Sequence, residues 1–194
     1  MKKIGEGAEA IIYLETVYGK EIVIKSRKPK DYRIKELDNR IRRQRTKKEA
    51  KLMKKASNSG INAPKVIAVG QTVILMDKID GKLFKDIAIT KLHARAFGDI
   101  LAKLHNSGIV HGDFTPANLM YDGEKIYLID FGLSESTTSN EEKALDILLM
   151  KRQLASTIYN HFIKSYSASR SSKETLTRLA EIEERGRYQS RTLG

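Results

Sequence analysis

Apolar and polar residues follow two different periods along this chain, and the change of period separates a strand-rich first part from a helical second part. Short apolar runs bounded by glycine and polar residues predict three strands within residues 4–25, with a turn at residues 18–20. The apolar spacing then lengthens and predicts a helix over residues 37–56. Residues 64–69 and 72–76 return to strand spacing and predict a hairpin.

The second part of the chain shows helical spacing of its apolar residues. An amphipathic helix is expected over residues 90–107, where Gly108 ends it. One long helix is expected over residues 141–164, and a last helix over residues 173–184, after a serine-rich break. The final stretch, 185–194, is basic and has no apolar period, so we expect it to be disordered or ordered by a partner.

The composition is that of a folded protein and excludes several classes of site. Hydrophobic residues make up 40% of the 194 residues, which is enough to form a core in one domain or two compact lobes. There is no cysteine, so a disulfide framework and a thiolate metal site are excluded. No apolar run approaches the roughly 20 residues that span a bilayer, and the first residues do not form a signal peptide. We therefore expect a cytoplasmic protein without a membrane segment.

The positive charge is concentrated in one segment. The chain carries a net charge of +12, and residues 25–55 alone hold fifteen Lys and Arg against four acidic residues. Two interpretations stay open: a solvated helix face, or a surface for an anionic partner, of which RNA fits clustered basic charge best. On the expected helix, the outward basic side chains are Arg40, Arg42, Arg43, Lys47, Lys51 and Lys54.

The stretch 111–132, HGDFTPANLMYDGEKIYLIDFG, carries the clearest chemistry. Phosphoryl transfer needs a carboxylate beside the attacking oxygen and oxygen ligands for Mg²⁺. Asp113 fits the first role, and Asn118 and Asp130 fit the second. A predicted strand over residues 125–129 would carry Asp130 out of a buried sheet into the metal site. The alternative is a hairpin whose polar turns have no catalytic role.

Two upstream elements suit a nucleotide phosphate. Gly5 and Gly7 let backbone amides approach phosphate oxygens, although Ala10 stands where a third glycine is usual. Lys25 ends a Val-Ile-Lys tripeptide on a strand, the pattern of a lysine that contacts the α/β-phosphates. Glu49 lies on the inward face of the expected helix, and an inward carboxylate needs a cation, so we expect a Lys25–Glu49 pair. The Gly-Lys-Ser/Thr ending of a P-loop is absent.

Four further polar residues have weaker expectations. His93 and His105 lie on or near the 90–107 helix and receive no role, because no third metal ligand is near either of them. His111 is expected to be structural and to hold the catalytic loop. Asp146 either braces that loop through hydrogen bonds or is a solvated helix carboxylate, and both interpretations stay open.

Taken together, these segments resemble a eukaryotic-type protein kinase reduced to a minimum, and more narrowly the small atypical kinase subunit of the KEOPS complex, the PRPK family. The resemblance covers almost the full length and rests on IGEGAEAIIY, RIRRQRTKKEAKLM, HGDFTPANLM, DFGLS, EEKALDI and the arginine-rich end. It implies an α+β, bilobal, minimal protein-kinase-like fold. The expected parts are a small β-rich N-lobe (1–76), a hinge (77–81), a truncated helical C-lobe (82–184) and a basic tail (185–194).

The same resemblance implies ATP and Mg²⁺ as cofactors of an atypical Ser/Thr protein kinase or ATPase. It assigns catalysis to Asp113 and Lys25, and metal binding to Asn118 and Asp130. The ATP contacts that it implies are Ile4, Gly5, Glu6, Gly7, Ala8, Glu9, Ala10, Ile12, Val23, Lys25, Glu49, Met120 and the hinge backbone of Asp77 and Ile79. The implied partners are a threonylcarbamoyl-transferase subunit, other KEOPS subunits and tRNA, reached through the basic helix and the tail.

Three departures from ordinary protein kinases bear on the substrate. His-Gly-Asp replaces His-Arg-Asp, so no arginine is available there to read a phosphorylated activation loop. Thr115 stands where Ser/Thr kinases usually carry a lysine that contacts the γ-phosphate. No Ala-Pro-Glu follows Asp-Phe-Gly, and only 62 residues follow Gly132. Kinase chemistry is therefore better supported than a dedicated protein substrate.

Two other functions compete with this one. A small-molecule kinase of the aminoglycoside or choline type also carries His-Gly-Asp and a following Asn, but it builds its acceptor pocket in a C-terminal half that is short here. An RNA-binding scaffold with a kinase shape is the non-enzyme alternative. Intact Lys25, Glu49, Asp113, Asn118 and Asp130 argue against a loss of catalysis.

Overall fold

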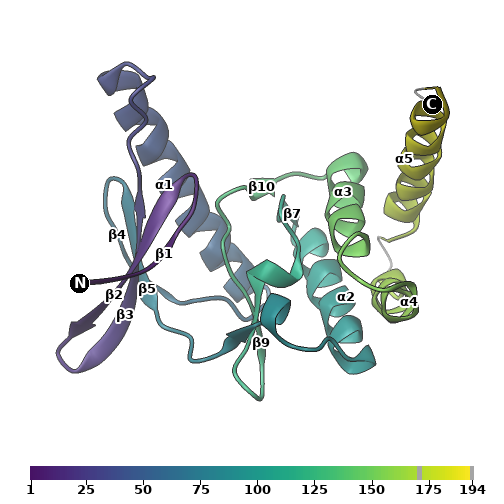
Figure 1. The fold of residues 1–194 in the computed structure, drawn as a ribbon, viewed down its shortest axis with the longest axis horizontal. Helices are drawn as coiled ribbons and strands as arrows, with labels where there is room; N and C mark the ends of the chain where they lie inside the picture. The colour runs from purple at the N-terminus through teal and green to yellow at the C-terminus, as the bar shows by residue number, and fades with distance from the viewer. Residues whose placement is uncertain (170–171, 193–194) are drawn as a thin grey trace.

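A five-stranded antiparallel sheet with one long helix across it forms the N-terminal half. The computed structural model describes residues 1–169 and 172–192 of the chain. The strands lie in the order β1-β2-β3-β5-β4, and Figure 1 shows them in the part of the molecule that holds the N-terminus. Their bounds are β1 (Lys2–Glu6), β2 (Ala10–Val17), β3 (Lys20–Arg27), β4 (Val66–Val69) and β5 (Val73–Asp77). These are the three strands and the hairpin that the apolar pattern predicts.

Helix α1 (Lys35–Asn58) spans the length of this sheet and confirms the predicted helix, with two residues more at each end. Glu36 and Asp38 lie in its first turn, where acidic side chains complement the positive end of the helix dipole. Leu52, Met53 and Ala56 are almost fully buried and pack α1 against the sheet. Truncation of such a side chain, as in Met53→Ala, typically costs about 2–5 kcal/mol, so the packing holds α1 in place.

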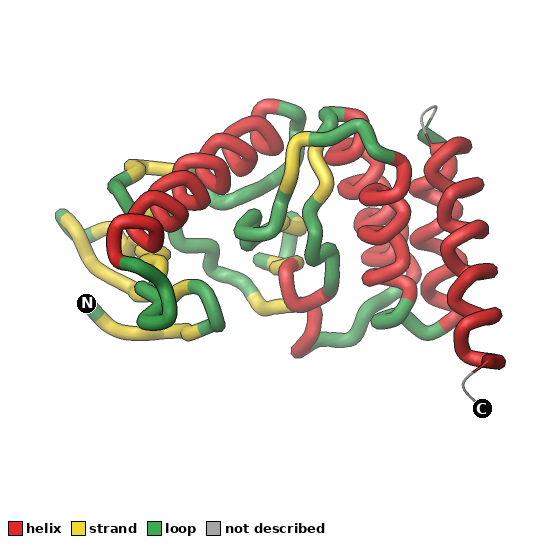
Figure 2. Tube along the Cα trace, turned by 90° about the horizontal axis from the view of Figure 1, so that it is seen from above, coloured by secondary structure: helices red, strands yellow, loops and turns green. Residues whose placement is uncertain are grey.

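Four helices form most of the C-terminal half and lie side by side in Figure 2. They are α2 (Lys91–Asn106), α3 (Asn140–Lys151), α4 (Ser156–Ser167) and α5 (Ser172–Thr192). Gly98 allows α2 and α4 to approach closely, because a Cβ at this position would lie 2.3 Å from the Phe162 carbonyl oxygen. Five phenylalanines are buried in the core of this half: Phe84, Phe97, Phe114, Phe131 and Phe162.

Short strands lie between the two halves and position the loops of the 111–132 stretch. Strands β6 (Lys82–Leu83), β8 (Leu119–Tyr121) and β9 (Ile126–Leu128) form one small sheet, and β7 (Ile109–Val110) pairs with β10 (Glu135–Ser136). Two 3-10 turns, η1 (Phe84–Asp86) and η2 (Pro116–Asn118), complete the region. The loop with Asp113 therefore begins at the end of β7. Asp130 follows the end of β9, the strand that the apolar pattern predicts before it.

Two sequence predictions differ from the structure. The expected single helix over residues 141–164 is two helices, because Ala155 has an extended backbone (ψ 145°) and turns the chain between α3 and α4. This break lets α4 pack on α2 while α3 packs on α5. The end of the chain from residue 185, expected to be disordered or ordered by a partner, continues α5 as far as Thr192, and residues 193–194 lie outside the described residues. None of the helices in the described ranges is long and apolar enough to cross a membrane.

Candidate active site

Lys25 joins the two halves of the molecule at the centre of the site. It lies on β3, in register with Ile12 on β2 and Ile74 on β5. Its Nζ donates to Glu49 Oε1 on α1 and to Asp130 Oδ1 after β9, each at 2.6 Å. Only 9% of the Lys25 side chain and 1% of the Glu49 side chain are exposed. The expected Lys25–Glu49 pair is thus present and extends to the Asp-Phe-Gly motif.

Asp130 has an unusual backbone for a non-glycine residue, with φ 58°. Such left-handed conformations are costly and cluster at functional sites. Oδ1 also accepts a hydrogen bond from Gly132 N at 3.0 Å, while 52% of the side chain is exposed. Partial burial opposes ionisation, but the charge and hydrogen bond of Lys25 outweigh it, so the pKa of Asp130 lies below its usual value. A carboxylate that is ionised at neutral pH is therefore presented at the rim of the cleft.

Asn118 connects the two aspartates of the motif. Its Nδ2 donates to the Asp113 carboxylate (Oδ2, 2.8 Å) and to the Asp113 carbonyl oxygen (2.9 Å). The backbone carbonyl oxygen of Asn118 accepts a hydrogen bond from the backbone N–H of Ile129, the residue before Asp130, at 2.9 Å. The amide nitrogen is therefore used within the loop, which leaves the amide oxygen as the donor atom for a metal.

The donor chemistry of this pair fits Mg²⁺. Among the described residues, no group of three or more His, Cys, Asp or Glu side chains could hold a metal ion. Mg²⁺ does not need such a cage, because it usually keeps several waters and binds one or two protein oxygens together with substrate phosphates. The Asp130 carboxylate and the Asn118 amide would hold it, as the sequence predicts, and this assignment stays a prediction.

Asp146 of α3 braces the catalytic loop from behind. Its carboxylate accepts from His111 N at 2.7 Å and from Gly112 N at 2.8 Å, and it is 1% exposed. Of the two open interpretations of Asp146, the bracing role is confirmed and the solvated carboxylate is wrong. The backbone immediately before Asp113 is thereby fixed by two charge-assisted hydrogen bonds.

His105 completes this support, although the sequence suggested no role for it. Its ring lies between Asp146 Oδ2, 3.2 Å from Nε2, and the Tyr166 hydroxyl, 2.8 Å from Nδ1. Burial lowers the pKa of His105 even though Asp146 favours the charged form, and burial likewise lowers the pKa of His111. Both rings are therefore neutral supports at neutral pH, and His111 fits its expected structural role, with Nε2 3.1 Å from the Ile129 carbonyl oxygen.

Gly112, in the middle of His-Gly-Asp, has no room for a side chain. Its φ is +78°, and a Cβ built on it would lie 2.5 Å from the Leu133 carbonyl oxygen. The loop that follows Asp-Phe-Gly thus packs directly on the catalytic loop, and the absence of an arginine at this position is a steric requirement of the packing.

A cavity of about 350 Å³ lies between the glycine-rich loop and the two aspartates. The predicted catalytic Asp113, the predicted metal ligand Asp130 and three further residues, Arg27, Gly132 and Leu133, line it. Seven predicted ATP contacts line it as well: Glu6, Gly7, Ala8, Glu9, Ala10, Ile12 and Lys25. The sequence patterns did not single out Arg27. A residue two positions after Lys25 on a strand nevertheless points to the same face of the sheet as Lys25. Ile4, Gly5, Val23, Glu49, Asp77, Ile79 and Met120 do not line this cavity, and the contacts expected of them with ATP stay predictions.

The glycine-rich loop is fastened to the basic segment. Arg45 Nη1 on α1 pairs with Glu9 Oε2 at 2.7 Å, and Lys30 Nζ donates to the Ala8 carbonyl oxygen at 2.7 Å. Gly7 N donates to the Ala10 carbonyl oxygen at 2.9 Å, which closes a tight turn at the tip. The loop therefore lies over the cavity with its backbone held from two sides.

A second cavity, of about 660 Å³, opens on the other side of Asp113. Its wall is partly apolar, with Ile87, Ile89, Leu154 and Ile158 among the lining residues, while Asp113 and Thr115 supply polar groups at one end. Asp113 thus lines two spaces, one beside the glycine-rich loop and one large enough for a phosphate acceptor.

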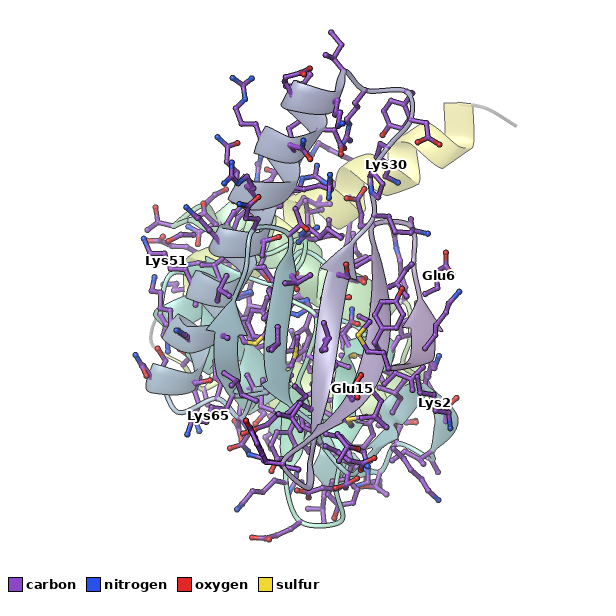
Figure 3. The ribbon with its side chains drawn as sticks, turned by 90° about the vertical axis from the view of Figure 1, so that its left-hand side faces the viewer. Lys2, Glu6, Glu15, Lys30, Lys51 and Lys65 are labelled. Atoms are coloured by element: carbon purple, nitrogen blue, oxygen red, sulfur yellow. The ribbon has the colours of Figure 1, made fainter. Side chains whose placement is uncertain are left out.

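The outer face of α1 presents unpaired basic side chains. Within the described residues, no ion pair is formed by five exposed residues: Arg40, Arg43, Lys47, Lys51 and Lys54. Figure 3 labels Lys51 on this flank of α1. Arg42 is an exception to the sequence prediction, because it is half-buried and donates to Asp38 Oδ2 at 2.6 Å. These five side chains are called the basic face below, and Arg42 is not part of it.

Comparison with known proteins identifies close relatives. Residues 16–176 match the family described as "RIO domain". The chain is 41% identical to "Probable serine/threonine-protein kinase BUD32 homolog" of Archaeoglobus fulgidus, over 88% of this chain and 90% of that protein. It is 36% identical to "KEOPS complex subunit Bud32" of Pyrococcus abyssi, over 99% of this chain and 98% of that protein.

A longer relative and a solved structure extend the comparison. The chain is 39% identical, over 96% of its length, to "Probable bifunctional tRNA threonylcarbamoyladenosine biosynthesis protein" of Methanosarcina barkeri, of which it spans 36%. The fold is similar to that of the Rio2 kinase from Chaetomium thermophilum, solved as an ADP/Mg²⁺-phosphoaspartate complex, with a TM-score of 0.69. That alignment covers 96% of this chain and 70% of the Rio2 chain at 19% identity, so it shows a shared kinase fold.

Proposed function

This chain belongs to the RIO-domain family of atypical kinases, and from that premise we propose that it transfers the γ-phosphoryl group of ATP to a hydroxyl group or to water. One observation carries the proposal. The Lys25 ammonium is held at 2.6 Å from both Glu49 and Asp130, which brings the two halves of the molecule together over one cavity. Mg²⁺, when bound, would neutralise charge on the phosphates.

The protein side chains divide the work of this reaction. Lys25 contacts the phosphates, and the backbone of the glycine-rich loop covers them. Asp130 and Asn118 hold the metal. Asp113 orients the attacking hydroxyl and accepts its proton while the bond between the γ-phosphorus and the bridging oxygen breaks and ADP leaves. Asp146 supports this by fixing the backbone that precedes Asp113.

The relatives suggest a setting for this activity. Since the Pyrococcus abyssi relative is named as a KEOPS subunit and the Methanosarcina barkeri relative as a tRNA threonylcarbamoyladenosine biosynthesis protein, we infer that this chain supports the same tRNA modification in the cytoplasm. Its partners would be a threonylcarbamoyl-transferase subunit, other KEOPS subunits and tRNA. The basic face and the basic end of α5 supply the positive charge that such a partner requires.

Two alternatives are tested by the same assays. A small-molecule kinase of the aminoglycoside or choline type would use the cavity of about 660 Å³ beside Asp113 as its acceptor pocket. An RNA-binding scaffold would bind tRNA and show no nucleotide turnover. The ion pairs of Lys25 favour an enzyme over the scaffold.

The decisive experiment replaces Asp113 with asparagine. Asp113→Asn keeps the size of the side chain but removes the base, so ATP turnover should fall about 10²-fold or more while ATP binding changes little. Turnover is measured with labelled ATP, alone and with total tRNA, and binding by calorimetry. Normal turnover by Asp113→Asn protein would refute the proposed role, and turnover of an aminoglycoside or choline would favour the small-molecule kinase.

A further inference from the structure

Glu49 is paired with two cations rather than one. Lys25 Nζ contacts Oε1 at 2.6 Å, and Arg27 Nη2 contacts Oε2 at 2.5 Å. Both cations come from β3, two positions apart, so their side chains point to the same side of the sheet. The exposed fractions of the side chains are 9% for Lys25, 4% for Arg27 and 1% for Glu49. One buried carboxylate is therefore clamped at both oxygens.

The second cation matters because Lys25 has two other tasks. It already shares its ammonium with Asp130, and the proposed function requires it to contact the phosphates as well. An ammonium has three donors, and a phosphate group that approaches it competes for them with Glu49. Removing the partner of a buried carboxylate is strongly destabilising, so Glu49 needs a cation that does not leave.

We propose that Arg27 is a positioning residue that keeps Glu49 paired and oriented while the Lys25 ammonium serves the nucleotide phosphates. The inference rests on the proposed function and deepens it, because it assigns a task to a residue that the kinase pattern does not require. Arg27 acts through Glu49, and Glu49 in turn sets the direction from which Lys25 enters the cavity.

The chemistry of arginine suits this task. The guanidinium is always charged and holds a carboxylate with a rigid fork of donors, so it does not lose its charge when the surroundings become drier. Its Nη1 also faces Glu9 of the glycine-rich loop at 3.9 Å. Arg27 thus lies between the helix that carries Glu49 and the loop that covers the phosphates.

A double-mutant cycle tests the proposal on the full chain. Arg27→Met should lower kcat for ATP turnover about tenfold or more, with KM for ATP changed by less than about threefold, because the nucleotide still meets Lys25. In the Glu49→Gln background, where there is no carboxylate left for Arg27 to keep paired, Arg27→Met should cost less than about twofold. Arg27→Lys should recover part of kcat, since it restores the charge without the fork.

A matched control comes from the C-terminal half. Arg178→Met removes an arginine that pairs with Glu141 between α5 and α3, away from the cavity, and should leave kcat and KM unchanged. Thermal unfolding of every variant, with and without Mg-ATP, separates loss of folding from loss of turnover. If Arg27→Met does not fold, the same cycle is run with Arg27→Lys and Glu49→Gln.

The outcomes are distinct. Effects of Arg27→Met and Glu49→Gln that multiply independently would overturn the proposal, because they would show that Arg27 does not act through Glu49. A rise in KM alone would also overturn it and would indicate direct contact between Arg27 and the phosphates. Absence of ATP turnover in the unmodified chain would overturn the proposed function together with this inference. If the unmodified chain turns over ATP but the effects of Arg27→Met and Glu49→Gln are independent, only this inference is overturned.

Discussion

The two sides of helix α1 hold charged side chains in opposite circumstances. On the inner side, Glu49 is buried and held by Lys25 and Arg27 at 2.6 and 2.5 Å. On the outer side, the basic face has no ion pair within the described residues. Charges that are paired and buried fix a geometry, whereas exposed charges of one sign create a field that attracts a partner.

This difference predicts different consequences of substitution. Breaking a buried pair leaves a charge without compensation and costs about 3–5 kcal/mol, while an exposed ion pair contributes about 0–1 kcal/mol. Changes on the inner side should therefore reduce turnover or stability, and changes on the outer side should affect only the binding of another molecule.

The largest effect is expected at Asp130, which shares Lys25 with Glu49. Asp130→Ala removes the carboxylate proposed to hold Mg²⁺, so Mg²⁺-dependent ATP turnover should fall about 10³-fold. The matched control is Glu124→Ala, which removes an exposed carboxylate from the turn before β9 and should leave turnover unchanged. Turnover is measured across a Mg²⁺ titration. If Asp130→Ala keeps more than a tenth of the activity, the metal is held elsewhere.

A smaller effect is expected at Asp146, a buried and paired carboxylate in the C-terminal half. It tests whether burial and pairing stabilise that half as they are expected to do on the inner side of α1. Asp146→Ala leaves the buried N–H group of His111 and the partly buried N–H group of Gly112 without their acceptor, and a buried group left unpaired costs about 1–3 kcal/mol. The free energy of unfolding, measured with urea, should therefore fall by about 3 kcal/mol. Asp146→Asn keeps an acceptor oxygen and should lose less. A loss below about 0.5 kcal/mol for Asp146→Ala would mean that the loop rearranges without strain.

The smallest effect on the chain itself is expected on the outer side of α1. Reversing three charges with Arg40→Glu, Arg43→Glu and Lys47→Glu should leave the free energy of unfolding within about 0.5 kcal/mol. Affinity for tRNA should weaken about tenfold or more, and the log-log salt slope should fall by about one unit for each phosphate that the variant no longer binds. The control reverses three exposed lysines elsewhere: Lys82, Lys103 and Lys125. Equal losses in both variants would show that net charge, rather than this face, attracts tRNA.

The sequence was sufficient for the parts of the site that depend on local order. Asp113, Asn118 and Asp130 lie within one short stretch, and the strand before Asp130 has a clear apolar pattern, so their grouping was predictable. The family and the bilobal kinase-like fold were also predictable, and the comparisons confirm them. Glu49 was predictable because a single acid on an inward helix face needs a cation.

Features that depend on contacts between distant segments were not predictable. Arg27 and His105 find their partners Glu49 and Asp146 across 22 and 41 positions of the chain. The strand period places Arg27 on the face of Lys25, but it does not identify the carboxylate that Arg27 meets. The break between α3 and α4 has the same origin, since residues 152–155 contain neither glycine nor proline. Packing of α4 against α2 at Gly98, rather than local preference, decides where the chain turns.

The steric contact at Gly112 has a consequence for the evolution of control in this chain. An arginine at position 112 would have to adopt a φ of +78° and push aside the Leu133 backbone, which a Cβ would approach to 2.5 Å. A single codon change therefore cannot install the arginine with which other kinases read a phosphorylated activation loop. Two loops would first have to separate. Control through an arginine at this position is therefore incompatible with the packing of these two loops.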